Sequence, residues 1–198
     1  MVDRFVMFWG LISTLCTGAI ASVLGFYSVS WLPANHNILR SIVIYFVYWI
    51  LLANLQATLL DRKFKNKKFA SRWFFTTSIV GILVMFLHDF IVLKVMDINT
   101  GGQGAIALLY TLPSLAVSGG FILAFAQFLL IRNRYKPNFQ SNEVELNMFW
   151  LFIGVLSWVA GFAVLFFGAI FPPLLLVFPI VSTIKGWFIN KFLQATKE

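Results

Sequence analysis

The feature that most constrains this chain is a series of long apolar segments separated by short polar breaks. Six segments carry almost no charge: residues 5–32, 41–60, 73–95, 104–131, 148–168 and 172–190. A helix of about 20 apolar residues crosses the ~30 Å hydrocarbon layer of a bilayer. Because 60% of the residues are hydrophobic and 11% are charged, against roughly 45–50% and 25% in soluble domains, we expect one integral membrane domain over residues 1–198. Its fold class should be all-α, a polytopic bundle of six transmembrane helices.

The basic residues predict how this bundle is oriented. All Lys and Arg except Arg40 and Lys94 map to one side of the six segments. Cytoplasmic loops carry an excess of Lys and Arg, so both termini are expected in the cytoplasm, in a bacterial inner membrane or a thylakoid-type membrane. Tryptophan is enriched at membrane interfaces, and four tryptophans are expected at the inner ends of segments: Trp9, Trp73, Trp150 and Trp187.

A short pattern occurs in both the second and the fourth segment. Residues 52–59 and 123–130 share L-A-x-x-Q-x-x-L, and each copy precedes a basic break and a Trp-led segment. A parallel internal duplication and a chance match in Leu- and Ala-rich helices are both open. The pattern resembles polytopic membrane proteins common in cyanobacteria, over residues 52–81 and 123–161. Their motif has Gly around the Gln and an aromatic residue after it, which Phe128 keeps and Ala57 does not. The resemblance implies a membrane fold and no activity.

His88 and Asp89 are the first candidates for a ligand- or ion-binding site. They lie in the outer half of the third segment, where an ionisable side chain is costly and usually faces a partner or a cavity. An adjacent His–Asp pair can relay protons, hold a cation or bind a polar substrate. The alternative is a structural ion pair of Asp89 with Lys94 or Arg40. His88 alone could also ligate a pigment or haem, and no other cofactor is indicated.

Gln56 and Gln127 are the second pair of binding candidates. Both lie toward the cytoplasmic ends of their segments. An amide in hydrocarbon must find a hydrogen-bond partner, so both are expected to face other helices. They either join neighbouring helices or line one pseudo-symmetric polar site.

Small residues recur at helical spacing and predict close helix packing. Small side chains let membrane helices approach one another. The alternative is a groove for a ligand or a partner helix. The fifth segment carries Gly154, Gly161 and Gly168, and the fourth carries Ala116, Gly120 and Ala124.

The polar stretch over residues 61–72, between the second and third apolar segments, is predicted to form a strongly basic loop. Its cations are expected to contact anionic lipid headgroups, each contributing about 1 kcal/mol, so the net charge of +8 does not indicate nucleic acid. The six predicted headgroup contacts are Arg62, Lys63, Lys65, Lys67, Lys68 and Arg72.

Two classes of function fit this pattern. One cysteine and two histidines indicate no metal site, and no catalytic motif is recognisable, so we expect a non-enzyme. The first class is a small-solute or ion transporter or channel with a polar site in the third segment. The alternative is a non-catalytic membrane subunit or assembly factor of a larger membrane complex. A homo-oligomer or other subunits of such a complex are the expected protein partners.

Overall fold

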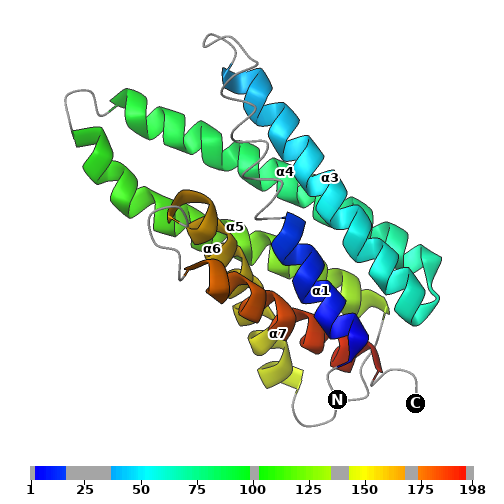
Figure 1. The fold of residues 1–198 in the computed structure, drawn as a ribbon. Helices are drawn as coiled ribbons and strands as arrows, with labels where there is room; N and C mark the ends of the chain where they lie inside the picture. The colour runs from blue at the N-terminus through cyan, green and yellow to red at the C-terminus, as the bar shows by residue number, and fades with distance from the viewer. Residues whose placement is uncertain (1–2, 17–36, 99–102, 135–142, 168–173, 195–198) are drawn as a thin grey trace.

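A computed structural model describes residues 3–16, 37–98, 103–134, 143–167 and 174–194. Over these ranges the chain forms helices and no strand, which confirms the all-α prediction. The helices, shown in Figure 1, are α1 (Arg4–Leu15), α3 (Asn37–Phe64), α4 (Lys67–Ile98), α5 (Gln103–Arg134), α6 (Glu143–Phe167) and α7 (Leu174–Gln194).

The helices do not end where the apolar segments end. α3 and α4 each extend several residues beyond their segments at both ends, where Lys and Arg, which are good helix formers, continue a helix past its apolar part. α1 covers the beginning of the first segment, whereas residues 17–32, Gly168 and the Pro172–Pro173 pair lie outside the described residues. Among the described residues, two helical stretches are long and apolar enough to cross a membrane, Lys67–His88 and Ser114–Arg132, while Arg4–Leu15 and Met148–Ala160 are apolar but shorter.

The prediction of a loop over residues 61–72 is wrong. α3 continues to Phe64 and α4 begins at Lys67, so only Lys65 and Asn66 connect them. The N–H of Lys65, which has a φ of 50°, donates to the Asp61 carbonyl at 2.8 Å. This is the left-handed motif that ends many helices. The side chain of Asn66 then accepts from the N–H of Phe69 at 3.0 Å and caps α4.

The helices contact one another in a closed ring, in the order α1, α3, α4, α5, α6, α7 and back to α1. The interior is filled largely by aromatic side chains. Trp9, Trp73 and Trp150 are each at most 1% exposed, and the rings of Trp9 and Trp73 meet edge to face at 5.8 Å. These three indoles therefore point across the ring toward other helices, and their expected place at the inner ends of the segments stays a prediction. Trp187 is 47% exposed.

Small residues lie where α5 and α6 meet. A Cβ at Gly154 would overlap the methyl group of Ala124, and one at Gly120 would come within 2.8 Å of Trp158. Ala116 and Ala124 are buried, and the Trp150 indole N–H donates to the Ala124 carbonyl at 3.1 Å. The surroundings of Gly161 are outside the described part of the chain, as is Gly168.

Asp3 joins three helices at one end of the ring. Its carboxylate accepts from the N–H of Phe5 at 2.9 Å and caps α1. The same side chain accepts from Lys63 on α3 at 2.7 Å and from Asn190 on α7 at 2.9 Å. The hydrogen bond from Lys63 is the main reason that the pKa of Asp3 lies below its usual value, and the bond from the Phe5 N–H adds to this.

Substituting Gly154 with Ala tests the α5–α6 contact. Helix propensity alone favours Ala by about 0.5–1 kcal/mol, whereas overlap with rigid neighbours costs about 1–3 kcal/mol. We expect Gly154→Ala to lower the Tm of the detergent-solubilised protein. Phe152→Leu, on a side chain that is 61% exposed, should leave it unchanged. A higher Tm for Gly154→Ala would mean that the two helices do not approach closely at this residue.

The Asp3 carboxylate should make stability depend on pH. A carboxyl whose pKa is lowered on folding stabilises the folded state above the unfolded value of 3.8, and this contribution is lost as the pH falls through the lowered pKa. Asp3→Asn keeps an N-cap side chain and should lower stability by about 0.2–1 kcal/mol at neutral pH. The difference in Tm from the wild type should shrink in acid. Asp61→Asn is the control, and an equal loss with it would contradict the assignment.

Candidate functional site

A cluster of polar side chains lies inside the ring, among apolar neighbours. We call it the inner polar cluster. Each member is at most 9% exposed. Five of the six described helices contribute a member, and the described residues of α6 contribute the adjacent Trp150 ring. The cluster consists of Ser13 on α1, Gln56 on α3, Trp73 and Thr77 on α4, Gln127 on α5 and Lys185 on α7.

Gln56 forms the first half of the cluster. Its amide N–H donates to the Ser13 hydroxyl at 3.4 Å, and its carbonyl oxygen accepts from the Trp73 indole N–H at 3.2 Å. Both ends of the amide are therefore used, and the side chain joins α1, α3 and α4.

Gln127 forms the second half. Its amide N–H donates to the Thr77 hydroxyl at 3.0 Å, and its carbonyl oxygen accepts from the Lys185 ammonium at 2.9 Å. This side chain joins α4, α5 and α7.

α4 brings the two halves together. Trp73 and Thr77 are four residues apart, so they lie on the same face of the helix on consecutive turns. The two glutamines, which come from helices on either side of α4, therefore contact adjacent turns of one helix. Both glutamines join neighbouring helices, as one of the two sequence interpretations expects.

Lys185 is the unusual member of the cluster. Its side chain is 91% buried, since 9% remains exposed, and its Nζ lies 5.9 Å from the centre of the Trp150 ring. Within the described ranges, Gln127 is its one hydrogen-bond acceptor and no carboxylate lies within 4.0 Å of it. An ammonium group has three donors, and a buried charge without a counter-charge is expensive. The Lys185 ammonium can therefore donate a further hydrogen bond to a negatively charged group, which would also offset its charge.

His88 lies in a separate environment from the glutamines. It is 5% exposed, and its ring meets that of Trp158 edge to face at 6.0 Å. A Cβ at Gly119 would come within 2.6 Å of the imidazole. Because His88 is eleven residues beyond Thr77, it lies about 16 Å further along α4. Asp89 belongs to α4, but its side chain is not among those described, so the predicted His–Asp site stays a prediction.

Two stacked tryptophans lie between the inner polar cluster and His88. The rings of Trp49 on α3 and Trp158 on α6 are parallel within 13° at 5.2 Å. Gly81 on α4 makes room for Trp49, because any Cβ there would overlap the indole. The stack therefore fills the interior of the ring at this level.

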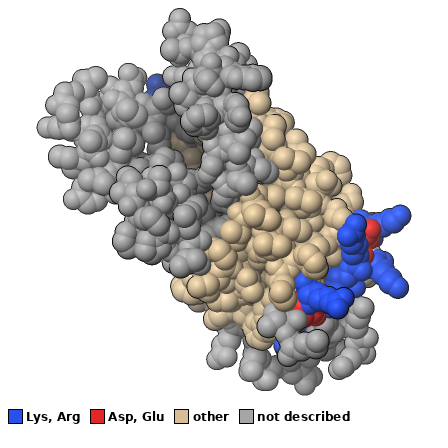
Figure 2. Space-filling view, in the orientation of Figure 1, with Lys and Arg blue, Asp and Glu red and all other residues tan. Residues whose placement is uncertain are grey.

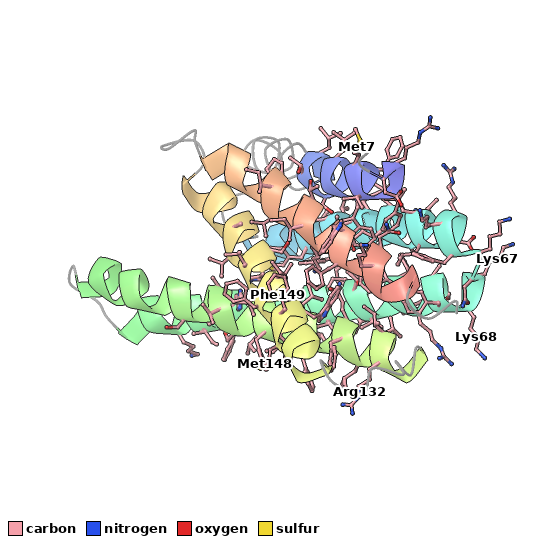
Figure 3. All side chains as sticks on the ribbon, turned by 90° about the horizontal axis from the view of Figure 1, so that it is seen from below. Met7, Lys67, Lys68, Arg132, Met148 and Phe149 are labelled. Carbon is pink, nitrogen blue, oxygen red and sulfur yellow. The ribbon has the colours of Figure 1, made fainter. Side chains whose placement is uncertain are left out.

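The predicted headgroup residues gather at one end of the molecule. Figure 2 shows Lys and Arg side chains concentrated there, next to a broad surface without charge. Lys67 and Lys68 point away from the helices (Figure 3), Arg62, Lys65 and Arg72 are exposed, and Lys63 pairs with Asp3.

The sequence interpretation missed Lys185. The orientation prediction places Lys185 with the basic residues of the inner side, although it lies within the sixth apolar segment, several residues before Lys191. A lone lysine inside such a segment is itself a signal of function. Ser13 and Thr77 carried no comparable signal, since hydroxyl side chains are common in membrane helices and their partners come from distant helices.

The described residues include no group of three or more His, Cys, Asp or Glu side chains that could hold a metal ion. Comparison with known proteins gives no match to a family model, to a curated protein or to a solved structure.

Removing either partner of the Gln127–Lys185 hydrogen bond should have unequal effects. Gln127→Leu removes the acceptor of the buried Lys185 ammonium and the donor to the Thr77 hydroxyl. Each lost partner costs about 1–3 kcal/mol. Lys185→Met removes the charge at similar volume and leaves only the neutral Gln127 carbonyl oxygen without its donor, which costs less than an unpaired buried charge. The double variant should therefore be more stable than Gln127→Leu alone in thermal unfolding. Additive losses would show that the two side chains do not interact.

Proposed function

We propose that this chain is a multi-pass integral membrane protein with six transmembrane helices. The outer surface of the ring supports a membrane location, because large apolar side chains are exposed on every described helix. Soluble monomers rarely expose contiguous apolar patches of more than a few hundred Å². Examples of such exposed side chains in this protein are Met7, 58% exposed, Leu83, 62%, Phe152, 61%, and Ile180, 59%.

The proposed orientation places both termini in the cytoplasm of a bacterial inner membrane or a thylakoid-type membrane. The Asp3 contacts support it, because they bring the start of α1, the end of α3 and the last turns of α7 to the same end. The exposed cations at that end fit the excess of positive charge on the cytoplasmic side of membrane proteins. Anionic lipid headgroups are the proposed contacts of these cations.

We propose that the protein is a transporter or channel for a small anion. The observation that carries this proposal is the buried charge of Lys185 beside Gln127, which has no carboxylate partner among the described residues. Ionisable side chains inside membrane bundles usually mark the path of a substrate or ion. A small anion near Lys185 would gain a charge-assisted hydrogen bond and would offset the cost of burying the ammonium.

The path in this proposal runs along the inner face of α4. It begins at the basic end of the ring, reaches the inner polar cluster and continues toward His88. The Trp49–Trp158 stack lies across it, so the structure would correspond to a closed state, and these rings would have to separate during passage. The proposal gives no residue a catalytic role.

Anion flux into liposomes tests this function. The purified chain is reconstituted with an entrapped halide-quenched dye, and the rate of iodide entry is measured. Lys185→Met should reduce that rate at least tenfold, because the cation that attracts the anion is gone. Lys191→Met is a matched control, since Lys191 also lies 5.9 Å from a tryptophan ring but is exposed. The proposal would be contradicted if wild-type liposomes took up iodide no faster than protein-free liposomes. It would also be contradicted if the two variants gave equal rates.

The second candidate is a non-catalytic subunit or assembly factor of a membrane complex. The use of both ends of each glutamine amide in joining helices supports it, because joining helices requires no ligand. Gentle solubilisation from the native membrane separates the two candidates. A stoichiometric partner polypeptide would favour the subunit, and a homo-oligomer or a monomer without a partner would favour transport.

A further inference from the structure

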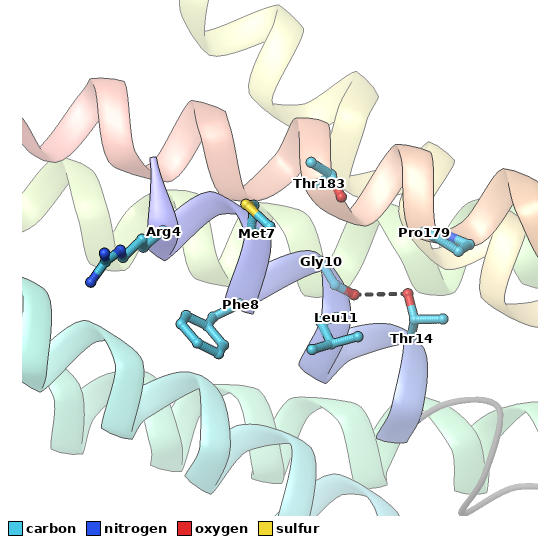
Figure 4. Close-up of a pocket in the computed structure, with 8 residues that line it drawn as sticks. All are labelled: Arg4, Met7, Phe8, Gly10, Leu11, Thr14, Pro179 and Thr183. Atoms are coloured by element: carbon cyan, nitrogen blue, oxygen red, sulfur yellow. Dashed lines mark hydrogen bonds between the residues drawn. The ribbon is translucent and has the colours of Figure 1, made fainter. Parts of the chain in front are cut away.

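An apolar groove of about 730 Å³ runs along the outer side of α1 and α7. Figure 4 shows that α1 contributes most of the lining and that α7 contributes Thr183 and Pro179. Met7, Phe8 and Leu11 each leave more than half of their surface exposed, and they lie on one face of α1 at spacings of three and four residues. The groove is separate from the inner polar cluster, which lies inside the ring.

The groove depends on a close approach of the two helices at Gly10. A Cβ at Gly10 would overlap the Thr183 side chain, so this glycine allows α1 to pack directly on α7. On the other side of the contact, a Cβ at Gly186 would come within 2.8 Å of Trp9. The absence of a side chain at Gly10 and at Gly186 therefore allows α1 to pack closely against α7.

Arg4 is the charged residue of the lining and lies at one end of it. Its side chain is exposed, and it forms no ion pair with a described residue. The neighbouring Asp3 does not neutralise it, since that carboxylate is engaged by Lys63 and Asn190. From Arg4 to Thr14 at the other end, α1 rises about 15 Å.

We propose that this groove binds one anionic phospholipid of the cytoplasmic leaflet. Its phosphate contacts the Arg4 guanidinium, which can donate two parallel hydrogen bonds to phosphate oxygens. One acyl chain lies along Met7, Phe8 and Leu11 toward Thr14. Charge complementarity favours this occupant over a transmembrane helix or a second copy of the chain, because the single cation lies at the basic end, at headgroup level. This inference rests on the proposed membrane location and is independent of transport.

Native mass spectrometry of the full chain tests the site. The protein is extracted in mild detergent, mixed with phosphatidylglycerol or phosphatidylcholine, and the bound lipid is counted. The wild type should retain one phosphatidylglycerol in preference to phosphatidylcholine. Arg4→Gln should weaken this binding about fivefold, corresponding to about 1 kcal/mol for one cation, and Arg4→Lys should restore much of it. Arg72→Gln, which removes an exposed cation outside the groove, should bind like the wild type.

Leu11→Trp provides a second test. The larger side chain fills the groove and should abolish the binding of phosphatidylglycerol and of phosphatidylcholine alike. Equal binding by Arg4→Gln and Arg72→Gln would overturn the site and leave only general attraction by the basic end. A dimer that Leu11→Trp dissociates would assign the groove to a second copy of the chain instead. A wild type that stays monodisperse without detergent would overturn the membrane location itself.

Discussion

The arrangement of this protein depends on the satisfaction of polar groups inside an apolar bundle. Gln56 and Gln127 each use both ends of their amides on other helices, and both reach consecutive turns of α4. A buried amide without partners is costly, so these bonds constrain how α1, α3, α5 and α7 lie around α4. Close contacts at Gly10, Gly81 and Gly154 then let the helices approach, and the tryptophans fill the remaining interior.

The same cluster carries both the stability and the proposed activity. Lys185 completes the hydrogen bonding of Gln127, yet it keeps a buried charge that the described residues do not neutralise. A side chain used only to join helices needs no charge, which is why Lys185 supports anion passage rather than packing alone. The outer surface has a different chemistry, since its apolar side chains face outward and most of its described cations gather at one end.

The sequence predicted the helical class and much of the position of each described helix, because long apolar runs have few other ways to satisfy their backbone. It failed at the helix ends, because good helix formers carry a helix beyond its apolar part. For the same reason it predicted a loop over residues 61–72, where only Lys65 and Asn66 connect α3 and α4. It did not predict that Trp9, Trp73 and Trp150 are buried against other helices. A tryptophan near a helix end can face lipid or another helix, and only the neighbouring helices decide which.

The sequence by itself determined that Gln56 and Gln127 need partners, because an amide in an apolar segment must be hydrogen-bonded. Only the tertiary structure decided which partners they have. Ser13, Thr77 and Lys185 lie 43, 50 and 58 residues from their glutamines along the chain, and no local pattern encodes such a distance. The ring order of the helices brings them together, and with them it buries the charge on which the proposed function depends.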